Sequence, residues 1–401
     1  MVRWSNGVAI RAGETKLLLD PLESDPVIPD IFITHAHYDH AKGFQLLVQR
    51  KHSTRETREL YEAYAGREIG NWEQIRIGRR LLLGAVEVEA HDAGHILGSA
   101  QFEIITRDEN LVYASHLNFT DTLLTKAAEV APCDTLVLEA TFPMFSQALP
   151  NRESVTAEIV KWALECIHDH RVPTLATETI GVAQELMRVF NTWTELPVIV
   201  HNRIAQISQV YAKNGVDLRY LNAGTAEANS LVEEARCVAI IPRRFDTSRF
   251  GEFRVAYVTD SPTRVERDAG RVFAISDQAD LNQLLSFVKE ARPKTVLTIR
   301  GGAKVLAELV SKRLGIPGQV LYADVRSRSA NLLVDEEMVG KCEEYILSLV
   351  QETNLTYERQ ALIARALSEG FKLQLIEEAL NRLSRNKSLT YSGVTDGYSL
   401  P

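Results

Sequence analysis

The residues best suited to chemistry are concentrated in one short segment, HAHYDH, which begins at His35. In an extended chain alternate side chains share a face, so His35, His37 and Asp39 can converge on one point, and His40 adds a fourth donor as the chain turns. Neutral imidazole and carboxylate are zinc ligands, and a catalytic zinc site keeps one position open. We therefore interpret the segment as a zinc site rather than a solvated polar loop.

A second segment, DAGHILGSA, begins at Asp92 and places His95 between two glycines. Gly94 and Gly98 allow a close approach of the backbone around that histidine. A single histidine between apolar residues is more often a packed side chain than a ligand. Together with the first segment, however, His95 is the natural further ligand of the same metal ion.

These two segments together resemble the metallo-β-lactamase fold in its nucleic-acid-processing β-CASP branch, and three further stretches agree with the resemblance. They are VYASHLN at 112–118, DTLVLEATF at 134–142 and GVAQEL at 181–186. The second stretch aligns Glu139 with the acidic residue of the branch, and the third resembles a helix start in the inserted β-CASP domain. The resemblance covers residues 1–335.

The resemblance implies an α/β fold, a metallo-β-lactamase αββα sandwich with an inserted β-CASP α/β domain that closes over the metal cleft and forms a groove for nucleic acid. It implies a zinc-dependent nuclease whose metal ligands are drawn from His35, His37, Asp39, His40, His95 and His116. The expected catalytic residues are Asp39, Glu139 and His116. The expected substrate-binding residues are Arg300, Gln278, Arg243 and Arg244.

The chain departs from the family at three positions that concern a second metal ion and acid catalysis. His116 stands where the family has an aspartate that bridges two zinc ions, and an imidazole cannot bridge as a carboxylate does. Gln278 replaces a histidine that is thought to protonate the leaving group, and glutamine has no titratable proton. Arg300 replaces a histidine ligand, and arginine stays protonated and binds no metal.

These departures predict at most one tightly bound zinc ion, with the ligands His35, His37, His95 and, as a candidate, His116. Asp39 is the candidate base, and Arg300 is expected to pair with a phosphate oxygen in the role of the second metal. A single zinc ion lowers the pKa of bound water to about 7, which suffices for hydrolysis in other folds. If His116 completes a four-ligand shell, the site is structural instead.

Two functions of different classes follow from this pattern. The first is a zinc-dependent nuclease that acts on RNA or single-stranded DNA. The second is a catalytically inactive pseudo-nuclease that serves as a nucleic-acid-binding or scaffold subunit of a processing complex. The intact HAHYDH segment favours the first function, and the three departures favour the second. A small-molecule hydrolase such as a thioesterase is a third option, against which the β-CASP-like segments argue.

The elements that must position these residues alternate between strands and helices, which indicates an α/β protein. Strands are expected at 8–10, 16–19, 30–34, 85–90, 101–106, 111–115, 135–139, 197–201, 238–241, 272–275, 295–299 and 319–323. Helices are expected at 54–65, 151–170, 181–192, 280–292 and 303–314. The expected domains are a metallo-β-lactamase domain at 1–148 and 269–335, a β-CASP domain at 149–268 and a winged-helix-like domain at 336–401.

Composition narrows the class of protein further. The chain has 401 residues and a formal net charge of −8, so nucleic-acid binding would require a local basic cleft rather than a basic surface. It has no apolar run long enough to span a bilayer and no secretory signal at its start, and its four cysteines are far apart, so we expect a reduced, cytoplasmic setting. All ten histidines lie between His35 and His201.

Two basic regions are candidate contacts for a partner. Seven arginines lie between Arg243 and Arg271 with phenylalanines among them, a composition that can grip phosphates and stack bases, although a solvated surface segment fits equally well. The tail reads as three helices, at 335–352, 356–368 and 371–385, followed by a hairpin, which is the pattern of a winged helix. This tail is expected to contact either a nucleic-acid backbone or a protein partner, the former through Arg382, Arg385 and Lys387.

Overall fold

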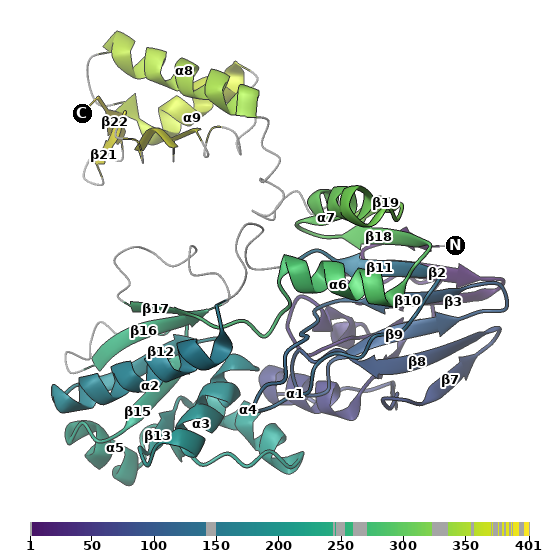
Figure 1. The fold of residues 1–401 in the computed structure, drawn as a ribbon, viewed down its shortest axis with the longest axis horizontal. Helices are drawn as coiled ribbons and strands as arrows, with labels where there is room; N and C mark the ends of the chain where they lie inside the picture. Colours follow the sequence, from purple (N-terminus) through teal and green to yellow (C-terminus); the bar gives the residue numbers. More distant parts are fainter. Residues whose placement is uncertain are drawn as a thin grey trace. The chain divides into compact units, whose positions relative to one another are not determined.

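The chain divides into two compact units, Met1–Tyr322 and Ala323–Pro401, in a computed structural model. The structure describes residues 2–141, 150–243, 245, 253–259, 271–322, 336–353, 357–369 and, with short gaps, 371–400. Within these residues no helix is both long and apolar enough to cross a membrane. The first unit contains three sheets and the second contains one, so the protein has the mixed α/β character that its sequence predicts (Figure 1).

The first sheet contains six strands in chain order: β1 (Val2–Trp4), β2 (Val8–Ala12), β3 (Thr15–Leu19), β4 (Asp30–Phe32), β5 (Arg50–Ser53) and β6 (Trp72–Gln74). β2 and β3 form a hairpin around Gly13, whose φ of 59° lies in the left-handed region that a tight turn favours. From β3 to β6 the strands pair in parallel. The carboxyl ends of β3 and β4 therefore lie side by side, and the HAHYDH segment follows β4.

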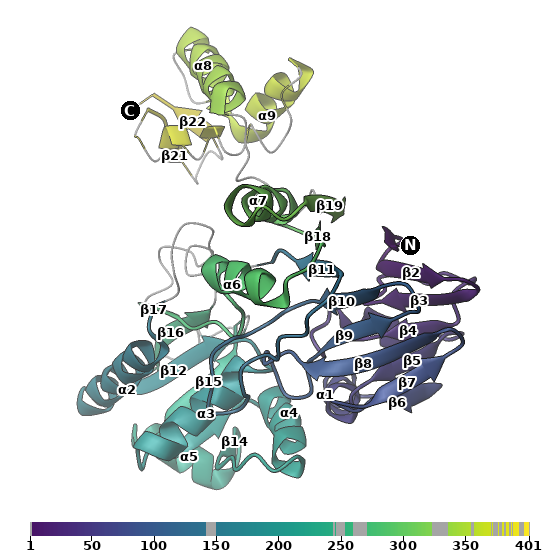
Figure 2. The same cartoon turned by 45° about the vertical axis from the view of Figure 1, so that its right-hand side comes forward.

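The second sheet contains seven strands in the order β19-β18-β11-β10-β9-β8-β7. Their bounds are β7 (Arg80–Leu83), β8 (Val86–Asp92), β9 (Ala100–Ile105), β10 (Asn110–Ala114), β11 (Thr135–Glu139), β18 (Thr295–Ile299) and β19 (Gly318–Tyr322). The alternation in β8 places Val86, Val88 and Ala90 in a core that also contains residues of the first sheet. The two sheets therefore pack as a sandwich, and their strands form separate layers in Figure 2.

Helices cover this sandwich. They are α1 (Arg55–Ala65), α6 (Leu281–Ala291), α7 (Ala303–Leu309) and two short segments, the 3-10 helix η1 (Ala41–Gln45) and the π-helix η3 (Val310–Leu314). α6 and α7 lie on the outer face of the second sheet, where Leu284 and Leu306 share a core with Val112 and Leu138 (Figure 1). α6 begins where its sequence predicts, because Asp280 and Gln283 form a capping box.

The third sheet lies between β11 and β18 along the chain. Its strands, all parallel, are ordered β14-β13-β15-β12-β16-β17. Their bounds are β12 (Val172–Thr177), β13 (Val198–Val200), β14 (Leu221–Asn222), β15 (Val238–Pro242), β16 (Phe253–Thr259) and β17 (Arg271–Ala274). The helices of this segment are α2 (Arg152–His168), α3 (Val182–Trp193), α4 (Asn202–Lys213) and α5 (Ala226–Glu233). β11 and β18 precede and follow this segment in the chain, and they are paired neighbours in the second sheet. The segment is therefore an insertion into the sandwich.

The sequence pattern missed several elements, including β1, β5, β6 and β7 in the sandwich and others in the inserted segment. β12 was not expected, and it carries Pro173, a residue that normally argues against a central strand. β16 and α4 were not expected either. β17 pairs with β16 in the third sheet, although the predicted domain division falls before it, at residue 268. β12 and β16 are each paired with parallel strands on both sides in the third sheet, and this tertiary pairing outweighs local propensity.

The C-terminal unit contains α8 (Glu336–Thr353), β20 (Tyr357–Glu358), α9 (Arg359–Ser368), β21 (Thr390–Ser392) and β22 (Gly397–Ser399). Its three strands form a sheet in the order β20-β22-β21, with β21 and β22 as an antiparallel pair. A core of its own includes Ile346, Leu362, Leu380 and Tyr398. Much of the expected third helix at 371–385, including Arg385, and also Lys387, lies outside the described residues.

Candidate metal centre and cleft

The candidate site is assembled at the carboxyl ends of four buried strands. His35 lies shortly after β4, His116 follows β10, Glu139 ends β11 and Arg300 follows β18. β10, β11 and β18 pair in parallel, so their ends meet at one edge of the second sheet. Residues far apart in the sequence thereby come together at this edge.

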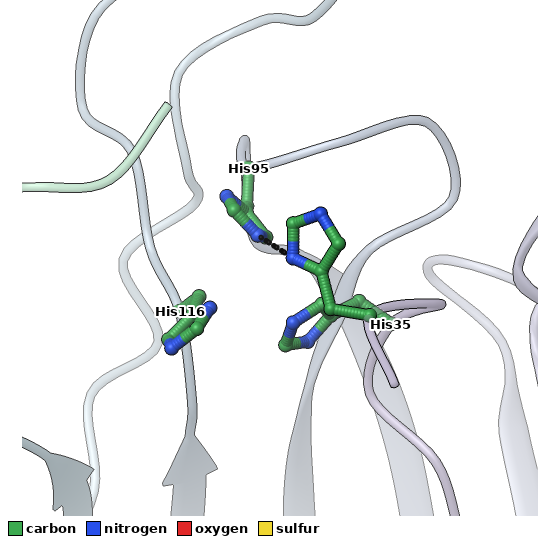
Figure 3. Close-up of side chains that lie close together, drawn as sticks. His35, His95 and His116 are labelled. Carbon is green, nitrogen blue, oxygen red and sulfur yellow. Dashed lines mark hydrogen bonds between the residues drawn. The ribbon is translucent and has the colours of Figure 1, made fainter. Parts of the chain in front are cut away.

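Four histidines form the first cluster of the site. One ring nitrogen from each of His35, His37, His95 and His116 lies within 4.8 Å of the others. The rings of His35, His95 and His116 surround a common space in Figure 3. His37 Nδ1 lies 3.1 Å from His95 Nε2, and all but His37 are buried. Four imidazoles this close together have few N–H groups with which to satisfy the lone pairs of their neighbours.

The hydrogen bonds around the cluster fix which nitrogen atoms face its centre. Thr34 Oγ1 donates to Asp20 Oδ2 at 2.7 Å and so accepts a bond of 3.0 Å from His35 Nδ1, which leaves His35 Nε2 as a buried lone pair without a partner. His95 Nδ1 donates to the backbone oxygen of Asp277 at 2.8 Å, so its Nε2 is also a lone pair. His116 Nδ1 has no hydrogen-bond partner, and His116 Nε2 lies 3.4 Å from Glu139 Oε1.

The electrostatic environment keeps His35, His37 and His95 neutral. Burial and the neighbouring imidazoles lower the pKa of His35 and of His95 well below the ordinary value of 6.5. Desolvation and His116 lower the pKa of His37 to about 4. Neutral imidazole is the form that binds a metal ion, and histidine ligands of zinc usually donate their other N–H to a nearby oxygen. The orphaned lone pairs, the fixed tautomers and the donor type therefore fit one zinc ion.

A second group of possible ligands lies beside the first and has a different character. One ligand atom from each of His40, His116 and Glu139 lies within 4.8 Å of the others. Arg300 lies among these residues: its Nη1 is 3.0 Å from Asp39 Oδ2, and its Nε is 3.6 Å from Glu139 Oε1. The guanidinium of Arg300 already neutralises Asp39 and Glu139. The second group of ligands therefore does not fit a metal ion, whereas the four histidines do.

The charges of this second group balance one another. Burial raises the pKa of Glu139, but Arg300, His40 and His116 outweigh burial and hold it well below the ordinary 4.5. Burial and Arg300 lower the pKa of His40, but Asp39, Glu139 and a 2.8 Å bond to Asp20 raise it to about 10. His40 is therefore an imidazolium at neutral pH when no metal is bound, and it is held between carboxylates.

A cleft of about 350 Å³ opens over the metal cluster. Its walls include His37, Asp39 and His116 from the sandwich and Ile180, Arg243 and Thr259 from the inserted segment. Gln278 also lines it, and the buried Oε1 of Gln278 has no hydrogen-bond partner. Among the sequence-predicted substrate contacts, Arg243 and Gln278 thus face the cleft, Arg300 lies deeper beside Glu139, and Arg244 is outside the described residues.

The structure adds residues that sequence reasoning did not identify. Asp20 accepts hydrogen bonds from Thr34, His40 and Tyr113, and it adopts a left-handed φ of 44° directly after β3. Asp277 holds the tautomer of His95 through its backbone oxygen. The only sequence signal for Asp20 is its position, an aspartate at the end of an apolar strand. The contact of Asp277 with His95 has no sequence signal, because it is made by the backbone oxygen.

The fold of this chain is similar to that of a protein of known structure. No protein-family model matches the chain. A crystal structure of a protein of unknown function from Enterococcus faecalis superimposes with a TM-score of 0.57 at 12% identity, covering 80% of this chain and 96% of the other. At that identity the likeness concerns the fold alone, which is that of a sandwich with an inserted α/β segment.

Several curated proteins are similar to this chain in sequence. A probable DNA ligase of Opitutus terrae is 27% identical over 70% of this chain and 28% of its own length. An RNase J-like protein of Methanocaldococcus jannaschii is 22% identical over 53% of this chain and 55% of its own. The RNase aCSPSF2 of Saccharolobus solfataricus is 23% identical over 42% and 39%. This chain thus spans well under two thirds of each relative.

The fold and the histidine cluster resemble those of the metallo-β-lactamase class. A cleavage and polyadenylation specificity factor subunit 3 of Dictyostelium discoideum is also similar to this chain, at 25% identity over 51% of this chain and 30% of its own length. The chain is thus similar, at low identity, to metallo-β-lactamase/β-CASP proteins, as its sequence segments predict.

Proposed function

We propose that this protein is a zinc-dependent nuclease that hydrolyses phosphodiester bonds in RNA or single-stranded DNA, with one zinc ion bound by His35, His37 and His95 and one coordination position left open on the side of His116. The observation that carries the proposal is the cluster of buried imidazole nitrogens without partners, open to the cleft through His37. The names of the relatives support nucleic-acid processing and include both ribonucleases and a DNA ligase.

The chain's own residues have distinct roles in this proposal. A bound zinc ion would supply Lewis acidity toward a phosphate oxygen and would lower the pKa of a water molecule to about 7. Asp39 is the most exposed carboxylate of the site, and its neighbours His40, His116 and Arg300 keep its pKa well below 3.8 despite desolvation. We assign Asp39 to orient the attacking water as a hydrogen-bond acceptor, while the buried Glu139 anchors His116 and Arg300.

We assign the cleft to a single strand, because an arginine lies at its wall. Arg243 lies at its wall with Nη1 3.5 Å from Thr259 Oγ1 and 3.7 Å from Glu178 Oε1, so its charge is partly engaged but remains near the opening. We assign Arg243 and Gln278 to contact the backbone of the strand. The winged-helix-like tail would add a protein or nucleic-acid contact, and we place the whole protein in the cytoplasm.

A pseudo-nuclease is the second candidate function, and one observation favours it. All four histidines lie close enough to bind the same ion, and a closed four-ligand shell is typical of structural zinc. Gln278, which lines the cleft, also offers no proton to a leaving group. In this case the protein would bind a strand without cutting it and would serve as a subunit of a processing complex.

One experiment separates the two candidates. End-labelled RNA and single-stranded DNA are incubated with the wild-type protein and with a His37→Ala variant, and both cleavage and binding are measured. Cleavage that disappears in the variant supports the nuclease. Binding by both proteins with cleavage by neither supports the pseudo-nuclease. Cleavage that is unchanged in the variant would show that the histidine cluster is not the reaction centre.

A further inference from the structure

Arg300 lies where the backbone forces it into the site. It directly follows β18, and its φ of 63° is in the left-handed region, which turns the chain sharply. Two backbone hydrogen bonds, from Ala140 N to Ile299 O and from Gly302 N to Ala140 O, tie this turn to the end of β11. The side chain of Arg300 is only 14% exposed, so its guanidinium has little freedom to leave the site.

The guanidinium stands between two carboxylates of the second ligand group. Its Nη1 lies 3.0 Å from Asp39 Oδ2, on one side, and its Nε lies 3.6 Å from Glu139 Oε1, on the other. Glu139 is also held by hydrogen bonds of 3.0 Å from Ser115 Oγ and 2.7 Å from Thr141 Oγ1. The acidic groups that could attract a second metal ion are thus already neutralised by a permanent cation.

From this geometry we infer that Arg300 is a built-in replacement for a second metal ion: it excludes that ion and binds a phosphate group of the strand beside the zinc. The inference rests on the proposed function, because it takes one zinc ion in the histidine cluster as given. A guanidinium cannot lose its proton or donate a lone pair, so it repels a metal ion and occupies its carboxylates. Its planar fork carries five N–H donors, more than the two carboxylate contacts use.

The metal arm of the test counts zinc. Apo protein is loaded with zinc, dialysed and analysed for metal content as wild type, His116→Asp, Arg300→His and the double variant. We expect one equivalent in the wild type and in His116→Asp, because Arg300 still opposes the second ion, and two equivalents in the double variant. Two equivalents in the wild type or in His116→Asp would overturn the inference, and so would a double variant that holds only one.

The phosphate arm tests the anion-binding role without any cleavage. Inorganic phosphate is titrated into zinc-loaded wild type, Arg300→Gln and Arg300→Lys, and binding is followed by calorimetry. Loss of a charge-assisted hydrogen bond should weaken binding by roughly tenfold or more in Arg300→Gln, with an intermediate loss in Arg300→Lys, which keeps the charge but not the fork. Equal affinity in all three proteins would overturn the role of Arg300. A protein that shows one zinc and this phosphate site but no cleavage would refute the nuclease and leave the inference intact.

Discussion

Removing zinc should lower the thermal midpoint of this protein by several degrees, because the apo cluster is left with buried lone pairs. His35 Nε2 and His116 Nδ1 have no hydrogen-bond partner in the structure, and His116 Nε2 lies 3.4 Å from the acceptor Glu139 Oε1. Each unsatisfied buried polar group costs roughly 1–3 kcal/mol, and a zinc ion satisfies several at once. A ligand present at 100 times its dissociation constant stabilises the folded state by about 2.7 kcal/mol.

That free energy sets the size of the expected shift. The entropy of unfolding is about 2.1 cal/mol/K per residue, so for the unit Met1–Tyr322 each kcal/mol moves the midpoint by about 1.5 °C. Zinc should therefore raise the midpoint by roughly 4 °C over protein treated with a chelator. The assay is scanning calorimetry or fluorimetry of chelated protein with and without added zinc. His35→Ala is the variant that should abolish the shift, because it removes one of the four converging nitrogens.

A matched control comes from the same chain. His168 is an exposed histidine in the last turn of α2, far along the sequence from the cluster, so His168→Ala should keep the full zinc-dependent shift. The reasoning is refuted if zinc leaves the wild-type midpoint unchanged. It is also refuted if His35→Ala keeps the same shift as the control variant, because the stabilising zinc would then be bound elsewhere.

Two further predictions concern the cleft wall and the first sheet. Arg243→Ala should weaken binding of a single strand by roughly tenfold while leaving the zinc content unchanged, because Arg243 lines the cleft outside the metal cluster; unchanged strand affinity in a filter-binding or anisotropy assay would remove Arg243 from the binding surface. Asp30 is desolvated, but Arg50 and His52 outweigh this effect and lower its pKa below 3.8. Its stabilising contribution is therefore complete above pH 3.8 and is lost as the pH falls through its lower folded-state pKa. Asp30→Asn should thus lower the urea midpoint at pH 7, with a difference from wild type that narrows in acid; an equal difference at all pH values would contradict this assignment.

The convergence of the four histidines was predictable because their segments carry a local pattern. Alternation along an extended chain brings His35 and His37 to one face, and the glycines around His95 mark a close approach that the structure bears out: a Cβ at Gly94 would lie 2.4 Å from Asn118 O. Several elements of the sandwich, such as β8 and α6, were likewise expected close to their observed bounds, since amphipathic alternation and caps such as Asp280 are local signals. The strands β1, β5, β6 and β7 were not expected.

The rest of the site depends on contacts between distant segments. The left-handed turn at Arg300, the bond from His95 to the backbone of Asp277 and the bonds of the buried Asp20 to His40 and Tyr113 all depend on segments that are distant in the chain, and none of them has a signature in residue type. Within the inserted segment, β12 was missed because Pro173 argued against a strand that parallel pairing on both sides nevertheless stabilises. Local propensity gives no account of such pairing.

The central claim, that the histidine cluster is a one-zinc hydrolytic centre, is tested most directly by a titration. Metal-free protein receives increasing amounts of zinc, and single-turnover cleavage of labelled RNA and single-stranded DNA is measured at each step. We predict that cleavage of at least one of these strands rises with added zinc and reaches its plateau at one equivalent. A plateau at two equivalents, or strand binding without cleavage at every zinc concentration, would contradict the account.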